Sequence, residues 1–255
     1  PDFFPIGNKH VLLISTMGKV RWKVGTYSDQ RFTPEKEGVV DWGAYYAAKT
    51  MLDANGNRIL WGWIPETRRD TDLIAAGWAG AMSLPRTVSL DEHNEFQTEV
   101  APAVQVLRAS HTGSHRGGTV RQQALAALKI YDLAAELDVT IQPKNNAFTL
   151  RLQSDSGNFT AISCSNQSGG RELRVNTVTV PLSGDSNAPV HLHMYLDGSV
   201  LEVFAGKAVA LTSRVYQIPS GPLSLRLDGP AELTSLDLWP MKPISKDRLT
   251  GSLCS

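Results

Sequence analysis

Residues 11–29 have the sequence VLLISTMGKVRWKVGTYSD. The apolar run at the start of this stretch ends near Met17 and Gly18, and apolar residues then alternate with basic ones from Val20 to Val24. Such alternation is typical of a β-strand with one buried face, and a short break containing glycine is typical of a hairpin turn. The stretch therefore predicts two antiparallel strands joined by a tight turn.

The same pattern occurs twice more in the residues that follow. In KTMLDANGNRILWGWI (49–64), Asn55 and Gly56 lie between two apolar segments, which is a strong signal for a tight hairpin turn. SLPRTVSLDEHNEFQTEVA (83–101) contains a third pair of short apolar segments. Repeated meanders of short strands at even spacing are typical of propeller blades or of a barrel.

The pattern changes between residues 100 and 140. The segment from Gln122 to Leu137 is rich in Ala and Leu at helical spacing, which favours a helix. An edge strand with one apolar face fits the same residues in a chain whose other segments are strands. Both alternatives stay open from the sequence.

Strand-like segments return beyond this region and predict a β-sandwich, because many short strands follow one another closely. We therefore expect an all-β chain with a domain boundary near residues 100–115. The segments are NAFTLRLQSD, FTAISCSN, RELRVNTVTVPL, VHLHMYLDGSVLEVFAG, VALTSRVYQI, LSLRLDG and LTSLDLWPM.

Composition limits the partners of the chain. It has 255 residues, of which 42% are hydrophobic, enough for a substantial core. Its 25 basic and 25 acidic residues balance, so no charge excess suggests nucleic acid or an anionic membrane as a partner. The longest apolar run, at Val11–Ile14, is far shorter than the roughly 20 residues of a membrane-spanning helix. Neutral partners or small ligands are expected.

Motifs for several common chemistries are absent from the sequence, including a nucleophile elbow, a phosphate loop, a zinc motif and a dinucleotide fingerprint. Cys164 and Cys254 have neither metal-site spacing nor a disulfide framework. His191 and His193 alternate on one face of a predicted strand, a spacing that could bind a metal, but no third ligand is evident nearby. We predict a structural or exposed histidine pair and no metal site.

Aromatic and acidic residues cluster in DWGAYYAAK (41–49) and LWGWIPE (60–66). Sugars place their C–H faces against aromatic rings and donate hydrogen bonds to carboxylates, so both stretches suit a carbohydrate pocket. Tryptophans at alternating strand positions, such as Trp61 and Trp63, are also common in cores. From the residues alone, a sugar site and a packed core remain alternatives.

Several stretches together resemble the glycoside hydrolases of family 32, the invertases and fructan hydrolases. The early stretches resemble the closing part of the family's catalytic domain, and the late ones resemble the hairpin and final strand of its C-terminal domain. They are PDFFPIG (1–7), VGTYSDQRFTPE (24–35), DWGAYYAAKTMLDANGNRILWGWIPE (41–66), GWAGAMSLPRTVSLD (77–91), YLDGSVLEVFAGKAVALTSRVY (195–216) and LTSLDLWPM (233–241).

This resemblance implies the last blades of a five-bladed β-propeller in residues 1–105 and a β-sandwich in residues 106–255. It also implies retaining, β-fructofuranosidase-type hydrolysis of sucrose or fructans, without a cofactor or metal. Transfer of fructose in place of hydrolysis is one alternative. A non-catalytic carbohydrate-binding or structural sandwich module is another.

The resemblance also implies where the catalytic acids lie. In the family, a stretch like Pro1–Phe4 directly follows a Glu-Cys pair whose glutamate is the general acid/base, and the other two acids belong to earlier blades. We therefore expect no catalytic residue in this chain and expect the N-terminal part of the same enzyme as its partner.

We predict Asp41 and Trp61 as substrate-binding residues. In plant invertases of the family, an aspartate in an Asp-aromatic-Gly-Lys stretch helps to hold the glucose side of sucrose, and the lysine steadies it. Here the stretch is Asp41-Trp42-Gly43-Ala44. The resemblance thus implies a carboxylate without its lysine and a weaker preference for sucrose over fructans. Alternatively, another cation replaces the lysine, or Asp41 braces a blade.

Overall fold

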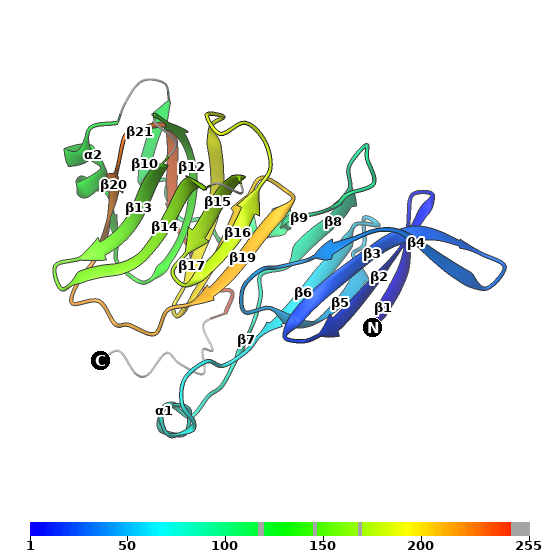
Figure 1. Cartoon of the computed structure of the whole chain (residues 1–255). Coiled ribbons are helices and arrows are strands. Elements are labelled where there is room, and N and C mark those ends of the chain that lie inside the picture. Colours follow the sequence, from blue (N-terminus) through cyan, green and yellow to red (C-terminus); the bar gives the residue numbers. More distant parts are fainter. Residues whose placement is uncertain (117–119, 145–146, 168–169, 246–255) are drawn as a thin grey trace.

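A computed structural model of the chain describes residues 1–116, 120–144, 147–167 and 170–245. The described strands form four sheets, and Figure 1 shows them as two neighbouring parts. Two smaller sheets are built from residues up to Val100, and two larger ones from Gly113 onward. The prediction of an all-β chain is confirmed in outline, because its few helices are short.

The first sheet is an antiparallel meander. Its four strands lie in chain order and are β1 (Asp2–Ile6), β2 (Lys9–Thr16), β3 (Lys19–Ser28) and β4 (Arg31–Val39). The predicted hairpin is confirmed, since Thr16 pairs with Lys19 across the turn. Met17 and Gly18 in the turn have φ values of 49° and 74°. Positive φ at both positions is typical of two-residue turns that match the twist of the flanking strands.

The second sheet contains the other two predicted hairpins. One is formed by β5 (Tyr46–Leu52) and β6 (Arg58–Ile64), the other by β8 (Arg86–Leu90) and β9 (Phe96–Val100). Between β6 and β8 lie helix α1 (Asp70–Ala76) and the short strand β7 (Ala81–Met82), which pairs with β6.

The two smaller sheets share one apolar core. Trp22 of β3 stacks on Phe96 of β9 with ring centroids 5.7 Å apart. Phe4, Leu13 and Leu60 are buried in the same cluster. Because the core crosses between the sheets, neither sheet buries its apolar face without the other.

The remaining strands form a β-sandwich of two six-stranded sheets. The first sheet, in spatial order, consists of β10 (Gly113–Arg116), β21 (Ala231–Pro240), β12 (Ala134–Pro143), β17 (Val190–Asp197), β18 (Val200–Ala205) and β19 (Val209–Arg214). The second consists of β11 (Lys129–Ile130), β20 (Leu223–Asp228), β13 (Ala147–Ser154), β14 (Gly157–Gln167), β15 (Gly170–Val175) and β16 (Val178–Leu182).

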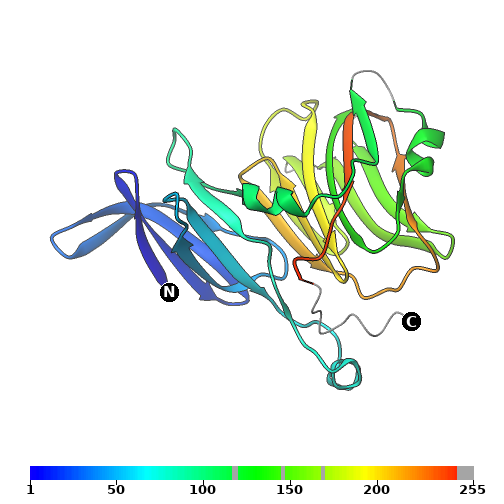
Figure 2. The ribbon, with the colours of Figure 1, turned by 180° about the vertical axis from the view of Figure 1, so that it is seen from behind.

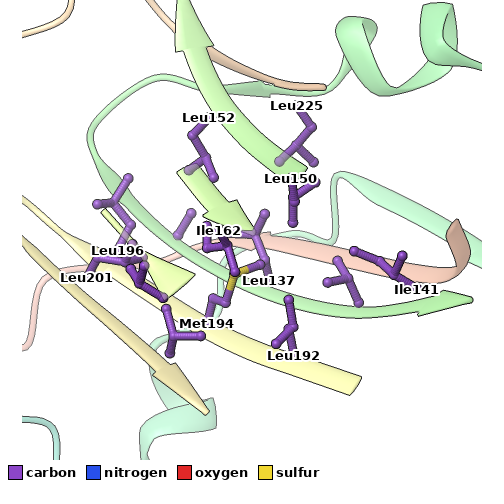
Figure 3. Packing of buried hydrophobic residues seen from close by; sticks show 14 of the residues in the cluster. Leu137, Ile141, Leu150, Leu152, Ile162, Leu192, Met194, Leu196, Leu201 and Leu225 are labelled. Carbon is purple, nitrogen blue, oxygen red and sulfur yellow. The ribbon is translucent and has the colours of Figure 1, made fainter. Parts of the chain in front are cut away.

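Apolar side chains from both sandwich sheets meet in one core, as Figure 3 shows. Leu137 and Leu192 come from the first sheet, and Leu150 and Ile162 come from the second. All four side chains are completely buried. Full burial of one such side chain contributes about 1.5–3 kcal/mol. Apolar burial between the sheets is therefore a major source of the sandwich's stability.

The expectation for residues 122–137 was only partly right. Helix α2 spans Gln122–Ala127, and β12 already begins at Ala134. Strand β12 is not at an edge, because it pairs with both β17 and β21. The apolar side chains of Ala135, Leu137, Val139 and Ile141 are all completely buried, and their spacing of two residues is the strand period and not the helical one. Tertiary pairing on both sides outweighed the helical propensity of its first residues.

The connection between the two parts is short. After β9 comes the 3-10 helix η1 (Pro102–Leu107), and Figure 2 shows this segment beside the sandwich. The predicted domain boundary between residues 105 and 106 lies within η1.

Cys164 is a buried free thiol, whereas Cys254 lies outside the described residues. Among the described helices, none has the length and apolar character needed to cross a membrane.

We predict that Gly198→Val destabilises the chain by about 1–2 kcal/mol, the cost of left-handed backbone for a residue with a Cβ. Gly198 lies in the hairpin turn in which Asp197 pairs with Val200, and its φ is +56°. Chemical denaturation of both proteins measures the difference.

Gly221→Ala is the matched control, because an added Cβ there meets no atom within 4 Å and needs no positive φ. It should leave the free energy of unfolding nearly unchanged. Equal stability of Gly198→Val and the unsubstituted chain would show that the turn tolerates a branched residue.

Candidate functional site

A fully buried arginine lies where the second sheet meets the sandwich. Arg86 begins β8, and its guanidinium lies over the rings of Tyr45 and Phe204, with distances of 4.3 and 4.8 Å to the ring centroids. Phe204 belongs to sandwich strand β18, whereas Tyr45 precedes β5. The cation therefore touches aromatic residues from both parts of the chain.

Arg86 binds two buried carboxylates. Its Nη2 donates to Asp41 Oδ2 at 2.9 Å and to Glu202 Oε2 at 2.6 Å. The same nitrogen lies 2.9 Å from Thr212 Oγ1, and Nε lies 3.2 Å from Glu202 Oε2. Glu202 and Thr212 are on adjacent sandwich strands. We call Arg86, Asp41, Glu202 and Thr212 the junction cluster.

Asp41 is completely buried in the junction cluster. Its Oδ1 accepts hydrogen bonds from the backbone N–H groups of Gly43 at 2.8 Å and Thr212 at 2.9 Å. Its Oδ2 accepts from the Thr212 hydroxyl at 2.7 Å. A direct contact with a sugar would require this carboxylate to leave its partners. The substrate contact of Asp41 stays a prediction. The contact with Arg86 fits the alternative in which another cation replaces the lysine of the Asp-aromatic-Gly-Lys stretch.

The segment after Asp41 pairs with the free edge of the sandwich. Trp42 N–H donates to Ala210 O at 3.0 Å, and Ala44 N–H donates to Thr212 O at 2.8 Å. A Cβ on Gly43 would lie 1.8 Å from Thr212 O, so no other residue fits without movement. The glycine of the Asp-Trp-Gly stretch thus serves close backbone contact.

Charge in the junction cluster is only partly balanced by Arg86. Burial lowers the pKa of Arg86, but the carboxylates of Glu202 and Asp41 outweigh it and hold that pKa above its ordinary value. Burial raises the pKa of Glu202 against the effect of Arg86.

Lys19 supplies a second cation nearby, since its Nζ donates to the carbonyl oxygens of Trp42 and Gly43. Burial raises the pKa of Tyr45 to about 12, so its hydroxyl stays protonated.

Trp61 lies apart from this cluster, in the wall of a cavity of about 340 Å³. The cavity lies between the second sheet, η1 and sandwich strand β17, and its walls are mostly apolar. Val104, Tyr195 and Met241 are among the lining residues, and the charged Asp197 and Lys242 also line it. The structure therefore places Trp61 beside this cavity, whereas Asp41 is buried among its hydrogen-bond partners.

Glu66, the acidic residue of the LWGWIPE stretch, belongs to a cationic and aromatic group that the sequence did not indicate. Arg68 binds it with two nitrogens, Nη2 to Oε2 at 2.7 Å and Nε to Oε1 at 3.1 Å. Tyr216 donates its hydroxyl to the same carboxylate, and Arg68 lies 4.3 Å from the Trp78 ring centroid. Hydrogen bonds from Arg68 hold the pKa of Glu66 well below its ordinary value.

The two strand histidines bind different carboxylates. His191 Nε2 lies 2.7 Å from Asp138 Oδ1, and His193 Nε2 lies 2.6 Å from Glu136 Oε1. Glu136 is fully buried and also accepts two hydrogen bonds from Arg108. Within the described ranges, no three His, Cys, Asp or Glu side chains are placed to hold a metal ion. Hydrogen bonding to carboxylates explains the spacing of the pair.

Solved structures with a similar fold include a fructan exohydrolase and a sucrose-6-phosphate hydrolase. Fructan 1-exohydrolase IIa from Cichorium intybus in complex with 1-kestose superposes with a TM-score of 0.73 at 19% identity, over 92% of this chain and 57% of that one. Sucrose-6-phosphate hydrolase from Lactobacillus gasseri gives a TM-score of 0.75 at 19% identity, over 95% of this chain and 54% of that one. At these identities the likeness shows the shared fold, a propeller followed by a sandwich.

Sequence comparison identifies the family. The family model described as "Glycosyl hydrolases family 32 N-terminal domain" matches residues 1–99, and "Glycosyl hydrolases family 32 C terminal" matches residues 87–240. The chain belongs to glycoside hydrolase family 32, and the resemblance noted in its motifs is confirmed.

Curated relatives are longer than this chain. A β-fructofuranosidase, insoluble isoenzyme, of Arabidopsis thaliana is 27% identical over 297 aligned residues, which cover 85% of this chain and 52% of the relative. A fructan 1-exohydrolase of Triticum urartu is 33% identical over 148 residues, which cover 54% of this chain and 24% of the relative. The chain thus spans about half the length, or less, of the relatives it matches.

We predict that Arg86→Met lowers the free energy of unfolding by about 3–5 kcal/mol, because it leaves buried carboxylates without their cation. Adding Glu202→Gln should recover part of that loss by removing one of the two charges. Chemical denaturation of the full chain measures both effects.

The control is Arg69→Met, which removes an exposed ion pair with Asp72 and should change stability by less than about 1 kcal/mol. If Arg86→Met were as stable as this control, the junction cluster would not hold the two parts together.

We predict that His191→Gln costs more stability at pH 5 than at pH 8.5, by a few tenths of a kcal/mol, at about the level of exposed ion pairs. The hydrogen bond to Asp138 raises the pKa of His191 above its ordinary value of 6.5. A raised pKa contributes stability below the unfolded pKa and loses it as the pH rises through the folded one.

Unfolding free energies of both proteins across this pH range test the prediction. A His191→Gln cost that is constant with pH would contradict it.

Proposed function

We propose that the complete protein containing this chain is a retaining β-fructofuranosidase-type hydrolase of sucrose or fructans. The observation that carries the proposal is the match of the family's N-terminal and C-terminal models in order along one chain. The named activities of the curated relatives, β-fructofuranosidase and fructan 1-exohydrolase, support the substrate class. No cofactor or metal enters the proposed reaction.

We propose further that the catalytic acids belong to the N-terminal part of the enzyme, before Pro1. Retaining glycosidases need two carboxylates about 5–5.5 Å apart, one to attack the anomeric carbon and one to protonate the leaving oxygen. In the first part of the chain, three carboxylates of the family-like stretches bind other groups of the protein. Asp2 accepts from the backbone N–H and hydroxyl of Thr50 at 2.7 Å, Asp41 binds Arg86, and Glu66 binds Arg68.

Trp61 is the better supported of the two predicted substrate contacts. Its indole borders the cavity at the junction, where an aromatic face could pack against the C–H face of a sugar unit. For Asp41, we propose an effect on substrate through residues 42–44, whose backbone it helps to place against strand β19. Direct sugar contact by Asp41 requires a rearrangement of the junction cluster.

The second candidate function is a non-catalytic carbohydrate-binding module. It is favoured by the sandwich having an apolar core of its own, distinct from the core of the smaller sheets. Binding without hydrolysis by the complete protein would support this alternative over the enzyme.

We predict that the 255-residue chain alone releases no fructose from sucrose or inulin, whereas the complete protein does. Loss of members of a cooperating catalytic set already lowers turnover by several powers of ten, and here the whole set is proposed to lie elsewhere. Fructose release by each purified protein, against a heat-denatured sample, measures the difference.

Two results would count against the proposal in different ways. Release of fructose by the chain alone would place catalytic acids within it. Lack of turnover by a folded complete protein that still binds fructan would instead favour the binding module.

A further inference from the structure

The sandwich carries a second hollow, of about 240 Å³, whose lining does not include Trp61. It is bordered by Thr112 before β10, by the segment between α2 and β12, and by the end of β21. Ile130, Ala135 and Leu238 are buried and give the hollow apolar walls. The space is closed by sandwich residues and has no wall from the second sheet.

Three side chains around the hollow have unused hydrogen-bonding groups. Lys129, Tyr131 and Asp132 all line it, and Tyr131 is 74% exposed. In the portion of the chain that the structure describes, the side chains of these three residues make no hydrogen bond, ion pair or ring contact. An ammonium, a phenol and a carboxylate are therefore available to a ligand, next to an apolar surface.

The geometry points to a sugar-binding site on the sandwich that takes a single neutral sugar unit, such as the end of an oligosaccharide. A sugar ring has C–H faces, which suit the Tyr131 ring and the apolar walls, and hydroxyls, which can accept from Lys129 and donate to Asp132. The hollow is smaller than the roughly 300–1,000 Å³ of drug-sized pockets, so it suits one ring.

Charge also favours a neutral ligand. Lys129 and Asp132 both line the hollow and have opposite charges, so the site has no net charge that would favour an anion or a cation. A purely apolar ligand would leave both charged groups without partners as it covered them. The site does not depend on the proposed hydrolysis, because none of its residues is assigned to that reaction.

The test is NMR of the full chain labelled with 13C at the methionine methyl groups, titrated separately with D-fructose and D-glucose. Met241 lines the hollow, whereas Met17 and Met51 are exposed elsewhere and serve as internal references. We expect a saturable shift of the Met241 signal with at least one of the two sugars. The sugar that binds identifies the preferred ring.

Two variants locate the binding. Tyr131→Ala and Asp132→Asn should each weaken the Met241 response by about tenfold or more, the effect of losing one charge-assisted hydrogen bond or stacking contact. Both residues are exposed, so the fold should persist. The matched controls are Tyr27→Ala in strand β3 and Asp72→Asn in helix α1, neither of which is buried. They should bind the sugar as the unsubstituted chain does.

Met241 also lines the junction cavity, so Trp61→Ala separates the two spaces. We expect the sugar-induced shift of the Met241 signal to persist in Trp61→Ala. The proposal is overturned if neither sugar shifts Met241, if the shift persists unchanged in Tyr131→Ala and Asp132→Asn, or if Trp61→Ala alone abolishes it. A response to inorganic phosphate in place of the sugars would also overturn it.

Discussion

The buried cation of Arg86 is the interaction on which the arrangement of the two parts depends. It binds Asp41 from the first part and Glu202 from the sandwich, and both carboxylates are buried with it. A buried ion pair adds little net stability compared with apolar packing, but an unpartnered buried charge is costly. The junction cluster therefore disfavours any arrangement in which these two parts separate and leave one of its charges without a partner.

Backbone pairing at the sandwich edge acts together with this cluster. Strand β19 is the last strand of its sheet, and exposed edges invite unwanted association. Residues 42–44 cover that edge, and Thr98 N–H adds a hydrogen bond to Lys207 O at 2.9 Å. The segment between β4 and β5 thus covers the edge of the sandwich sheet, which explains why Gly43 has to lack a side chain.

Local features of the fold were predictable because their causes are local. The hairpin in residues 11–29 follows from alternation and a turn, both of which act over a few residues. The segment from Gln122 to Leu137 was harder, since its helical composition extends beyond Ala127. There the pairing of β12 with β17 and β21, from distant parts of the chain, decided the structure.

The site shows the same division. The sequence by itself determined the family, because the order and spacing of the motifs can be recognised without the structure. It also led to the prediction of Asp41 and Trp61 as substrate-binding residues. Only the tertiary structure decided that Asp41 is buried against Arg86, 45 residues away, and that Arg86 reaches Glu202, 116 residues away. Pairings of charges at such separations depend on how sheets pack, and no local pattern of residues encodes them.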